Sequence, residues 1–122
     1  MQRILIAEDD PVLSMIYEIT LTEAGFDVLL CQDGQEALEA LDRFKPDLVI
    51  TDHSMPRMSG GELVSAVRKA RPNAATLMAS AVDARFLKDD QHADARLEKP
   101  VTPGRLLQTV REIEAARDAA QA

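Results

Sequence analysis

Five side chains with acid, hydroxyl or ammonium groups stand at the ends of short apolar segments of this chain. They are Glu8, Asp9, Asp52, Ser80 and Lys99. Short apolar runs bounded by turn residues are typical of strands buried inside a parallel sheet. Because the carboxyl ends of parallel strands meet at one edge, where open α/β sheets bind ligands, we expect these side chains to form one site.

The three acids of this set predict a site for a divalent cation. Carboxylates held close together repel one another, and at neutral pH they need either raised pKa values or a positive ion. Mg²⁺ accepts a few carboxylate oxygens, keeps several waters and binds a phosphate oxygen, and Mn²⁺ has similar ligand preferences. Ser80 would offer a phosphoryl oxygen a hydrogen bond and Lys99 a positive charge, while Asp52 is the natural nucleophile.

The segments that would position these side chains alternate between strand and helix patterns. Apolar runs predict strands over 3–7, 27–31, 48–52, 75–80 and 95–98. Helix starts are indicated by Asp10-Pro11, by the capping-box spacings Asp33/Glu36 and Ser59/Glu62, and by Thr102-Pro103. This alternation predicts a single α/β domain over 1–122, with a doubly wound five-stranded parallel sheet and helices on both faces.

Two segments carry weaker patterns. Residues 84–94 lack a sustained apolar period, so the helix expected there is short or frayed. The tail from Ala115 to Ala122 is expected to fray, which leaves an ordered core over about residues 2–115.

Composition excludes several classes of function. The net charge is −7, from 21 acidic and 14 basic residues without a basic run, which argues against direct nucleic-acid binding. A single cysteine, Cys31, and the lack of an apolar N-terminal stretch indicate a cytoplasmic protein with no signal peptide or membrane span. Cys31 is expected to be a core residue, and His53 and His92 are expected at the surface.

The first predicted helix, to about Ala24, is apolar over roughly two-thirds of its circumference, more than packing on one sheet face requires. Val12, Met15 and Ile19 form the extra stripe. Either the helix is deeply buried, or this stripe receives a partner protein.

Four motifs resemble the receiver domain of two-component response regulators, the CheY-like family, in order and spacing over essentially the whole chain. They are Ile6-Ala7-Glu8-Asp9-Asp10, Asp52-His53-Ser54-Met55-Pro56 with Gly60, Ser80-Ala81, and Lys99-Pro100. The resemblance implies the flavodoxin-like strand order 2-1-3-4-5. It also implies a signalling domain rather than an enzyme. Because the sequence pattern contains no second domain, we expect a stand-alone receiver.

The resemblance also implies roles for the site residues. Asp52 would accept a phosphoryl group from a histidine kinase or a histidine phosphotransfer protein. Its Mg²⁺ ligands would be Glu8, Asp9, Asp52 and the backbone carbonyl of Ser54.

Phosphoryl sensing would belong to Ser80, which would turn toward the new group. Lys99 would pair with a phosphoryl oxygen, its direction fixed by a cis Lys99-Pro100 bond. The output would pass to a downstream protein target. Receivers commonly place an aromatic residue where this chain has Arg96.

Two other classes of function fit parts of the pattern. A pseudo-receiver would keep the fold as an interaction module without taking a phosphoryl group. A metal-dependent phosphohydrolase typically needs a DxD pair, which Ser54 breaks in Asp52-His53-Ser54. A nucleotide-binding flavodoxin-like protein fits less well, because no Gly-rich loop follows the first strand.

Overall fold

The structure, a computed structural model, describes residues 1–121 except 82–84, 86 and 89–90. Five parallel strands form one sheet in the order β2-β1-β3-β4-β5, which confirms the predicted fold and strand order. The strands are β1 (Arg3–Ala7), β2 (Asp27–Cys31), β3 (Leu48–Asp52), β4 (Ala75–Ser80) and β5 (Ala95–Glu98). The helices are α1 (Pro11–Glu23), α2 (Gly34–Phe44), α3 (Gly60–Ala70) and α4 (Pro103–Gln121).

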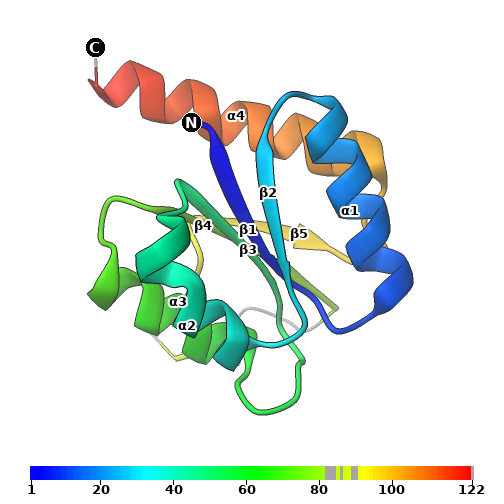
Figure 1. Ribbon diagram of the computed structural model, residues 1–122, viewed down its shortest axis with the longest axis vertical. Coiled ribbons are helices and arrows are strands. Elements are labelled where there is room, and N and C mark those ends of the chain that lie inside the picture. Colours follow the sequence, from blue (N-terminus) through cyan, green and yellow to red (C-terminus); the bar gives the residue numbers. More distant parts are fainter. Residues whose placement is uncertain (82–84, 86, 89–90, 122) are drawn as a thin grey trace.

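The sheet is covered on both faces, with α1 and α4 on one side and α2 and α3 on the other (Figure 1). Alternate residues of β1 serve the two cores: Ile4 and Ile6 pack toward α1 and α4, whereas Leu5 and Ala7 pack toward α2 and α3. Every residue of β3 and β4 is buried, as expected of central strands in a parallel sheet. No helix in the described residues is long and apolar enough to cross a bilayer.

The predicted capping signals start the helices. Asp10 Oδ1 accepts from the amides of Val12 and Leu13 at 2.8 and 3.2 Å, and Thr102 Oγ1 accepts from the amide of Arg105 at 3.2 Å. At α3 both bonds of the Ser59/Glu62 capping box are present. These bonds satisfy amides that the helix itself leaves free.

At α2 only half of the predicted capping box forms. The Glu36 amide donates to Asp33 Oδ1 at 2.8 Å, but the Glu36 carboxylate accepts from the Gln32 amide at 3.3 Å instead of from Asp33. The backbone at Asp33 is fully extended (φ −156°, ψ 174°), which brings the amide of the preceding residue within reach.

Two predictions for weak segments have different outcomes. The short helix expected over 84–94 includes residues 84, 86, 89 and 90, and these four residues lie outside the described part of the chain. The tail, expected to fray from Ala115, instead continues α4 to Gln121. The tail contains no glycine or proline that would interrupt a helix. In addition, the Arg117 side chain donates to the Asn73 carbonyl at 2.5 Å.

The apolar stripe of α1 is exposed rather than buried. Val12, Met15 and Ile19 are 58%, 52% and 50% exposed, whereas Tyr17 and Leu21 on the inner side of the helix are buried. The reading of α1 as a helix buried all round is therefore wrong. The stripe is free to contact another molecule.

Candidate functional site

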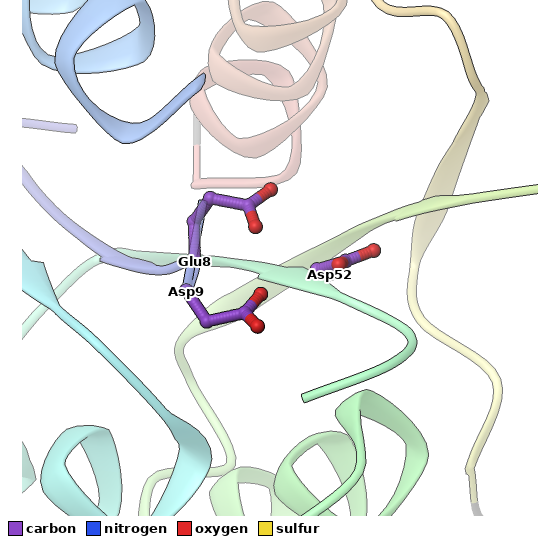
Figure 2. Close-up of side chains that lie close together, drawn as sticks. All are labelled: Glu8, Asp9 and Asp52. Atoms are coloured by element: carbon purple, nitrogen blue, oxygen red, sulfur yellow. The ribbon is translucent and has the colours of Figure 1, made fainter. Parts of the chain in front are cut away.

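The three acids meet at the carboxyl end of the sheet. β1 and β3 are adjacent and paired in register, with Ala7 opposite Thr51, so that Glu8 and Asp52 follow at the same level. One carboxylate oxygen from each of Glu8, Asp9 and Asp52 lies within 4.8 Å of the others. Figure 2 shows Glu8 and Asp9 extending from the end of β1 toward the side on which Asp52 lies.

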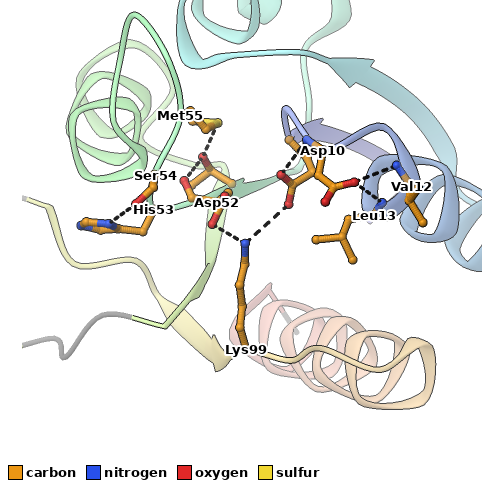
Figure 3. A network of polar contacts seen from close by, with 10 residues as sticks. Asp10, Val12, Leu13, Asp52, His53, Ser54, Met55 and Lys99 are labelled. Carbon is orange, nitrogen blue, oxygen red and sulfur yellow. Dashed lines mark hydrogen bonds and ion pairs between the residues drawn. The ribbon is translucent and has the colours of Figure 1, made fainter.

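Lys99 joins this cluster from the end of β5. Its Nζ lies 2.9 Å from Asp52 Oδ1 and 4.0 Å from Glu8 Oε1, and Figure 3 shows the side chain reaching up to Asp52. Burial acts to lower the pKa of Lys99, but the hydrogen bond to Asp52 and the neighbouring acids raise it above its usual value. The lysine is therefore a fixed positive charge at this edge. As expected, the Lys99–Pro100 peptide bond is cis.

Glu8 is the most buried acid of the cluster, with 3% of the residue exposed. Its Oε2 accepts from the Asp10 amide at 3.2 Å, whereas Oε1 is buried and accepts no hydrogen bond from the described residues. Burial, and next the charge of Asp52, raise the pKa of Glu8 to about 7, although the Asp10 amide and Lys99 act in the opposite direction.

These residues fit a hard divalent cation. The cluster offers three carboxylates close enough to share one ion, and Glu8 Oε1 is a buried acceptor with no donor in the described part of the chain. Oxygen ligands of this kind suit Mg²⁺, which keeps its remaining positions for water or phosphate.

A tight loop after β3 holds Asp52 in place. The Gly60 amide donates to the His53 carbonyl at 2.8 Å. A Cβ atom on Gly60 would lie 2.1 Å from the Asp52 carbonyl oxygen, which no side chain tolerates. Glycine is therefore required here because α3 begins directly against the backbone that carries Asp52.

Ser80 and Ser54 lie where the sequence predicts. Ser80 ends β4, is buried, and follows Ala79, the register partner of Asp52. Ser54 lies in the exposed loop directly after His53, with its Oγ 3.3 Å from the His53 Nδ1. The chain thus brings Glu8, Asp9, Asp52 and Lys99 close together, with Ser80 on the strand next to that of Asp52.

The remaining predicted residues fall outside the site. Cys31 is a buried core residue, and burial raises the pKa of its thiol to about 12, which makes it a poor nucleophile. The carbonyl of His92 accepts a hydrogen bond from Arg68. Arg96 lies on β5, partly buried, and its Nε has no hydrogen-bond partner among the described residues.

Sequence reasoning missed one contact that shapes the loop after Asp52. Arg57, in the left-handed conformation (φ 69°), donates to both carboxylate oxygens of Asp33 at 3.0 Å. Asp33 also caps α2, and its pKa is lowered by the Glu36 amide and then by Arg57. The two residues lie 24 positions apart, so no local pattern indicates their pairing.

Comparison with known proteins gives consistent matches. A family model described as the response regulator receiver domain matches residues 4–111. The alkaline phosphatase synthesis transcriptional regulatory protein PhoP of Bacillus subtilis is 30% identical over 105 residues, covering 84% of this chain and 44% of PhoP. The chain thus spans less than half the length of that relative.

Two solved structures extend this similarity to three dimensions. A response regulator receiver domain protein (CheY-like) from Methanospirillum hungatei JF-1 has a TM-score of 0.90 at 26% identity, over 98% of both chains. The response regulator protein TrrA of Thermotoga maritima, in complex with Mg²⁺-BeF, has a TM-score of 0.80 at 29% identity. That match covers 92% of this chain and 98% of TrrA.

Proposed function

The chain belongs to the response regulator receiver family, a family of signalling domains, and we propose that Asp52 is the residue on which it accepts a phosphoryl group. The observation that carries the proposal is the 2.9 Å contact between Asp52 Oδ1 and Lys99 Nζ beside two further acids. An acid at a sheet edge with a fixed counter-charge is suited to form an acyl phosphate on its own carboxylate.

In the proposed reaction an Asp52 carboxylate oxygen attacks the phosphorus of a phosphohistidine on a histidine kinase or phosphotransfer protein. The new P–O bond forms as the P–N bond of the donor breaks. Lys99 then exchanges its contact with Asp52 for one with a phosphoryl oxygen, which keeps its charge paired throughout. The Ser80 hydroxyl turns toward the phosphoryl group and communicates its presence to β4 and β5.

Glu8, Asp9, Asp52 and the Ser54 carbonyl would hold Mg²⁺, or Mn²⁺ in its place. When bound, the ion offsets the charge of the acids and of the transferring phosphoryl group. Support comes from the donor set itself and from the similar TrrA structure, which was solved with Mg²⁺-BeF. The site's own contribution is to keep the acids close together before the donor arrives.

The test is to incubate the protein with Mg²⁺ and acetyl phosphate and to record intact mass. We expect a gain of one phosphoryl group that is absent in Asp52→Asn and retained in the control Asp42→Asn, a change of exposed charge on α2. Rapid turnover of added phosphoesters would identify a phosphohydrolase instead. A wild-type protein that gains no mass would identify a phosphorylation-independent interaction module.

We further propose that the α1 stripe of Val12, Met15 and Ile19 contacts the phosphodonor protein. The stripe is half exposed or more and starts two residues after Asp10, the residue that follows the acid pair. A histidine from a partner must approach Asp52 at this same end of the sheet. The downstream target would then bind a surface other than the α1 stripe. The cytoplasmic location of the protein stays a prediction.

Replacing Met15 by aspartate tests this surface. We expect phosphotransfer from a histidine-containing donor protein to fall at least roughly fivefold, because truncating a central apolar contact commonly costs a complex about 1 kcal/mol or more. Phosphorylation by acetyl phosphate and the melting temperature should both stay at wild-type values. A loss with both donors would show that the substitution damages the site rather than the docking surface.

A further inference from the structure

Two buried polar atoms, one of them in the acid cluster, have no hydrogen-bond partner among the described residues. They are the hydroxyl oxygen of Tyr17, a residue 2% exposed, and Oε1 of Glu8. The other two such atoms among the described residues belong to Arg71 and Arg96, side chains that are only partly buried. A fully buried hydroxyl without a partner is unfavourable, so the position of Tyr17 requires a reason.

Tyr17 and Glu8 lie on the same side of the sheet. Tyr17 packs with Ile4 and Ile6 in the core beneath α1 and α4. Side chains alternate along a strand, so Glu8 continues the row of Ile4 and Ile6 toward this layer. Figure 2 agrees, since the Glu8 carboxylate lies toward the α1 and α4 ribbons and the Asp9 carboxylate lies toward α2 and α3.

Helix geometry predicts that the Tyr17 side chain extends toward the cluster. Tyr17 lies six residues beyond Pro11, the first residue of α1, which corresponds to roughly 9 Å along the helix axis. Helical side chains lean toward the N-terminus of their helix, and the N-terminus of α1 adjoins the acids. The long phenol ring is therefore expected to extend back along α1 toward Glu8.

The electrostatic surroundings of the phenol agree with this placement. Burial first, and then the charges of Glu8, Asp52 and Asp10, raise the pKa of Tyr17 to about 12. All three acids belong to the edge of the sheet that carries the cluster. The charges that act on the hydroxyl thus come from the acid cluster and its neighbour Asp10, not from the opposite end of the core.

We propose that Tyr17 is a positioning residue for Glu8, its hydroxyl donating a hydrogen bond that reaches Glu8 Oε1 across one bridging water in the cation-free protein. Such a water would have two polar partners, the Tyr17 hydroxyl and Glu8 Oε1, each of which lacks a hydrogen-bond partner among the described residues. The bond holds the Glu8 carboxylate in the orientation in which it can take a cation. This inference rests on the proposed cation site.

The protein carries its own reporter for this bond, because Tyr17 is its single tyrosine and it has no tryptophan. A phenol that donates toward a carboxylate emits less than one that does not. Tyrosine emission of the full chain therefore reports on the surroundings of the Tyr17 hydroxyl alone. No label or foreign residue has to be introduced.

The first experiment records this emission without a cation and during titration with Mg²⁺ alone. We expect Glu8→Gln to be brighter than wild type before any Mg²⁺ is added. Wild type should stay dim as Mg²⁺ binds, because a bond that favours binding must persist in the bound state. Asp9→Asn, which loses a carboxylate of the cluster but keeps Glu8, should show wild-type emission without the cation. Cation-free Glu8→Gln emission equal to that of wild type would overturn the proposal.

The second experiment measures Mg²⁺ affinity by calorimetry in Tyr17→Phe, which removes the hydroxyl and keeps the ring. We expect binding to weaken roughly two- to tenfold, the range of one ordinary hydrogen bond, with an undiminished melting temperature. The control Leu21→Val removes a buried methylene group from the same side of α1 and should lower the melting temperature without changing Mg²⁺ affinity. Wild-type affinity in Tyr17→Phe would also overturn the proposal.

The two hypotheses fail in distinguishable ways. If wild type does not bind Mg²⁺, the proposed cation site fails, while cation-free emission of Glu8→Gln still decides whether Tyr17 senses Glu8. Suppose instead that wild type binds Mg²⁺, that cation-free Glu8→Gln emits like wild type, and that Tyr17→Phe binds Mg²⁺ with wild-type affinity. Tyr17 is then a core residue only.

Discussion

Replacing Gly60 by alanine is expected to lower the free energy of unfolding by roughly 2 kcal/mol or more and to abolish the phosphoryl adduct on Asp52. The added Cβ would lie 2.1 Å from the Asp52 carbonyl oxygen and 2.9 Å from the His53 Cα. Both are backbone atoms, which cannot rotate away as a side chain can. The start of α3 must therefore separate from the end of β3, and Asp52 must move with it.

Two other glycines of helix first turns provide matched controls, with chemical denaturation and intact mass as the measurements. At Gly104 an added Cβ meets nothing within 4 Å, so Gly104→Ala should stabilise the protein by about 0.5–1 kcal/mol through its better helix propensity. At Gly61 the nearest atoms, at 3.0 Å, belong to the flexible Gln91 side chain, so a smaller loss is expected. Equal behaviour of Gly60→Ala and Gly104→Ala would contradict the contact with Asp52.

Glu8→Gln is expected to make the cation-free protein more stable near pH 8 and to remove most of its stabilisation by Mg²⁺. Folding raises the pKa of Glu8 from 4.5 to about 7, mainly by burial, so the folded protein binds this proton more tightly than the unfolded chain. The free energy of unfolding of the cation-free wild type should therefore fall as pH rises from about 4.5 to about 7. Glutamine removes the charge while keeping the shape.

The shift limits the size of this effect to about 3 kcal/mol, and screening at the rim of the sheet reduces the expected gain to roughly 1–2 kcal/mol. Urea denaturation at pH 4.5 and pH 8, with and without Mg²⁺, measures it. Glu23→Gln, the same charge change at the exposed end of α1, should leave the pH dependence of stability unaltered. A wild-type stability that rises between pH 5 and pH 8 would contradict the raised pKa of Glu8.

These two expectations oppose each other at one edge of the sheet. Gly60 lets the chain pack tightly enough to fix Asp52, whereas Glu8 makes the same edge less stable until a positive charge arrives. Lys99 compensates only in part, since its Nζ lies 4.0 Å from Glu8 Oε1 and pairs with Asp52. A site that concentrates negative charge is thus kept ready for a cation at the expense of stability in its absence.

The local parts of the structure could be predicted because they depend on short-range rules. Asp10 before Pro11 and Ser59 before Glu62 cap their helices as expected, since a cap involves residues two or three positions apart. The tail from Ala115 was expected to fray, whereas α4 runs to Gln121. The Arg117 contact with Asn73 joins residues 44 positions apart, which no local pattern indicates.

The sequence alone determined which residues form the site. Glu8, Asp9, Asp52, Ser80 and Lys99 each end or follow an apolar strand segment, and in a parallel sheet all such ends lie at one edge. The alternation of strands and helices therefore identifies the group without any contact being known.

Only the tertiary structure decided how these residues interact. The buried Oε1 of Glu8, the requirement for glycine at position 60, the clamp of Arg57 on Asp33 and the exposed stripe of α1 all depend on which distant segments pack together. Burial and distance set a pKa or a steric limit, and neither has a signature in the neighbouring residues. The sequence specifies which chemical groups are present, whereas the packing of α1, β1, β3 and Lys99 sets their distances and pKa values.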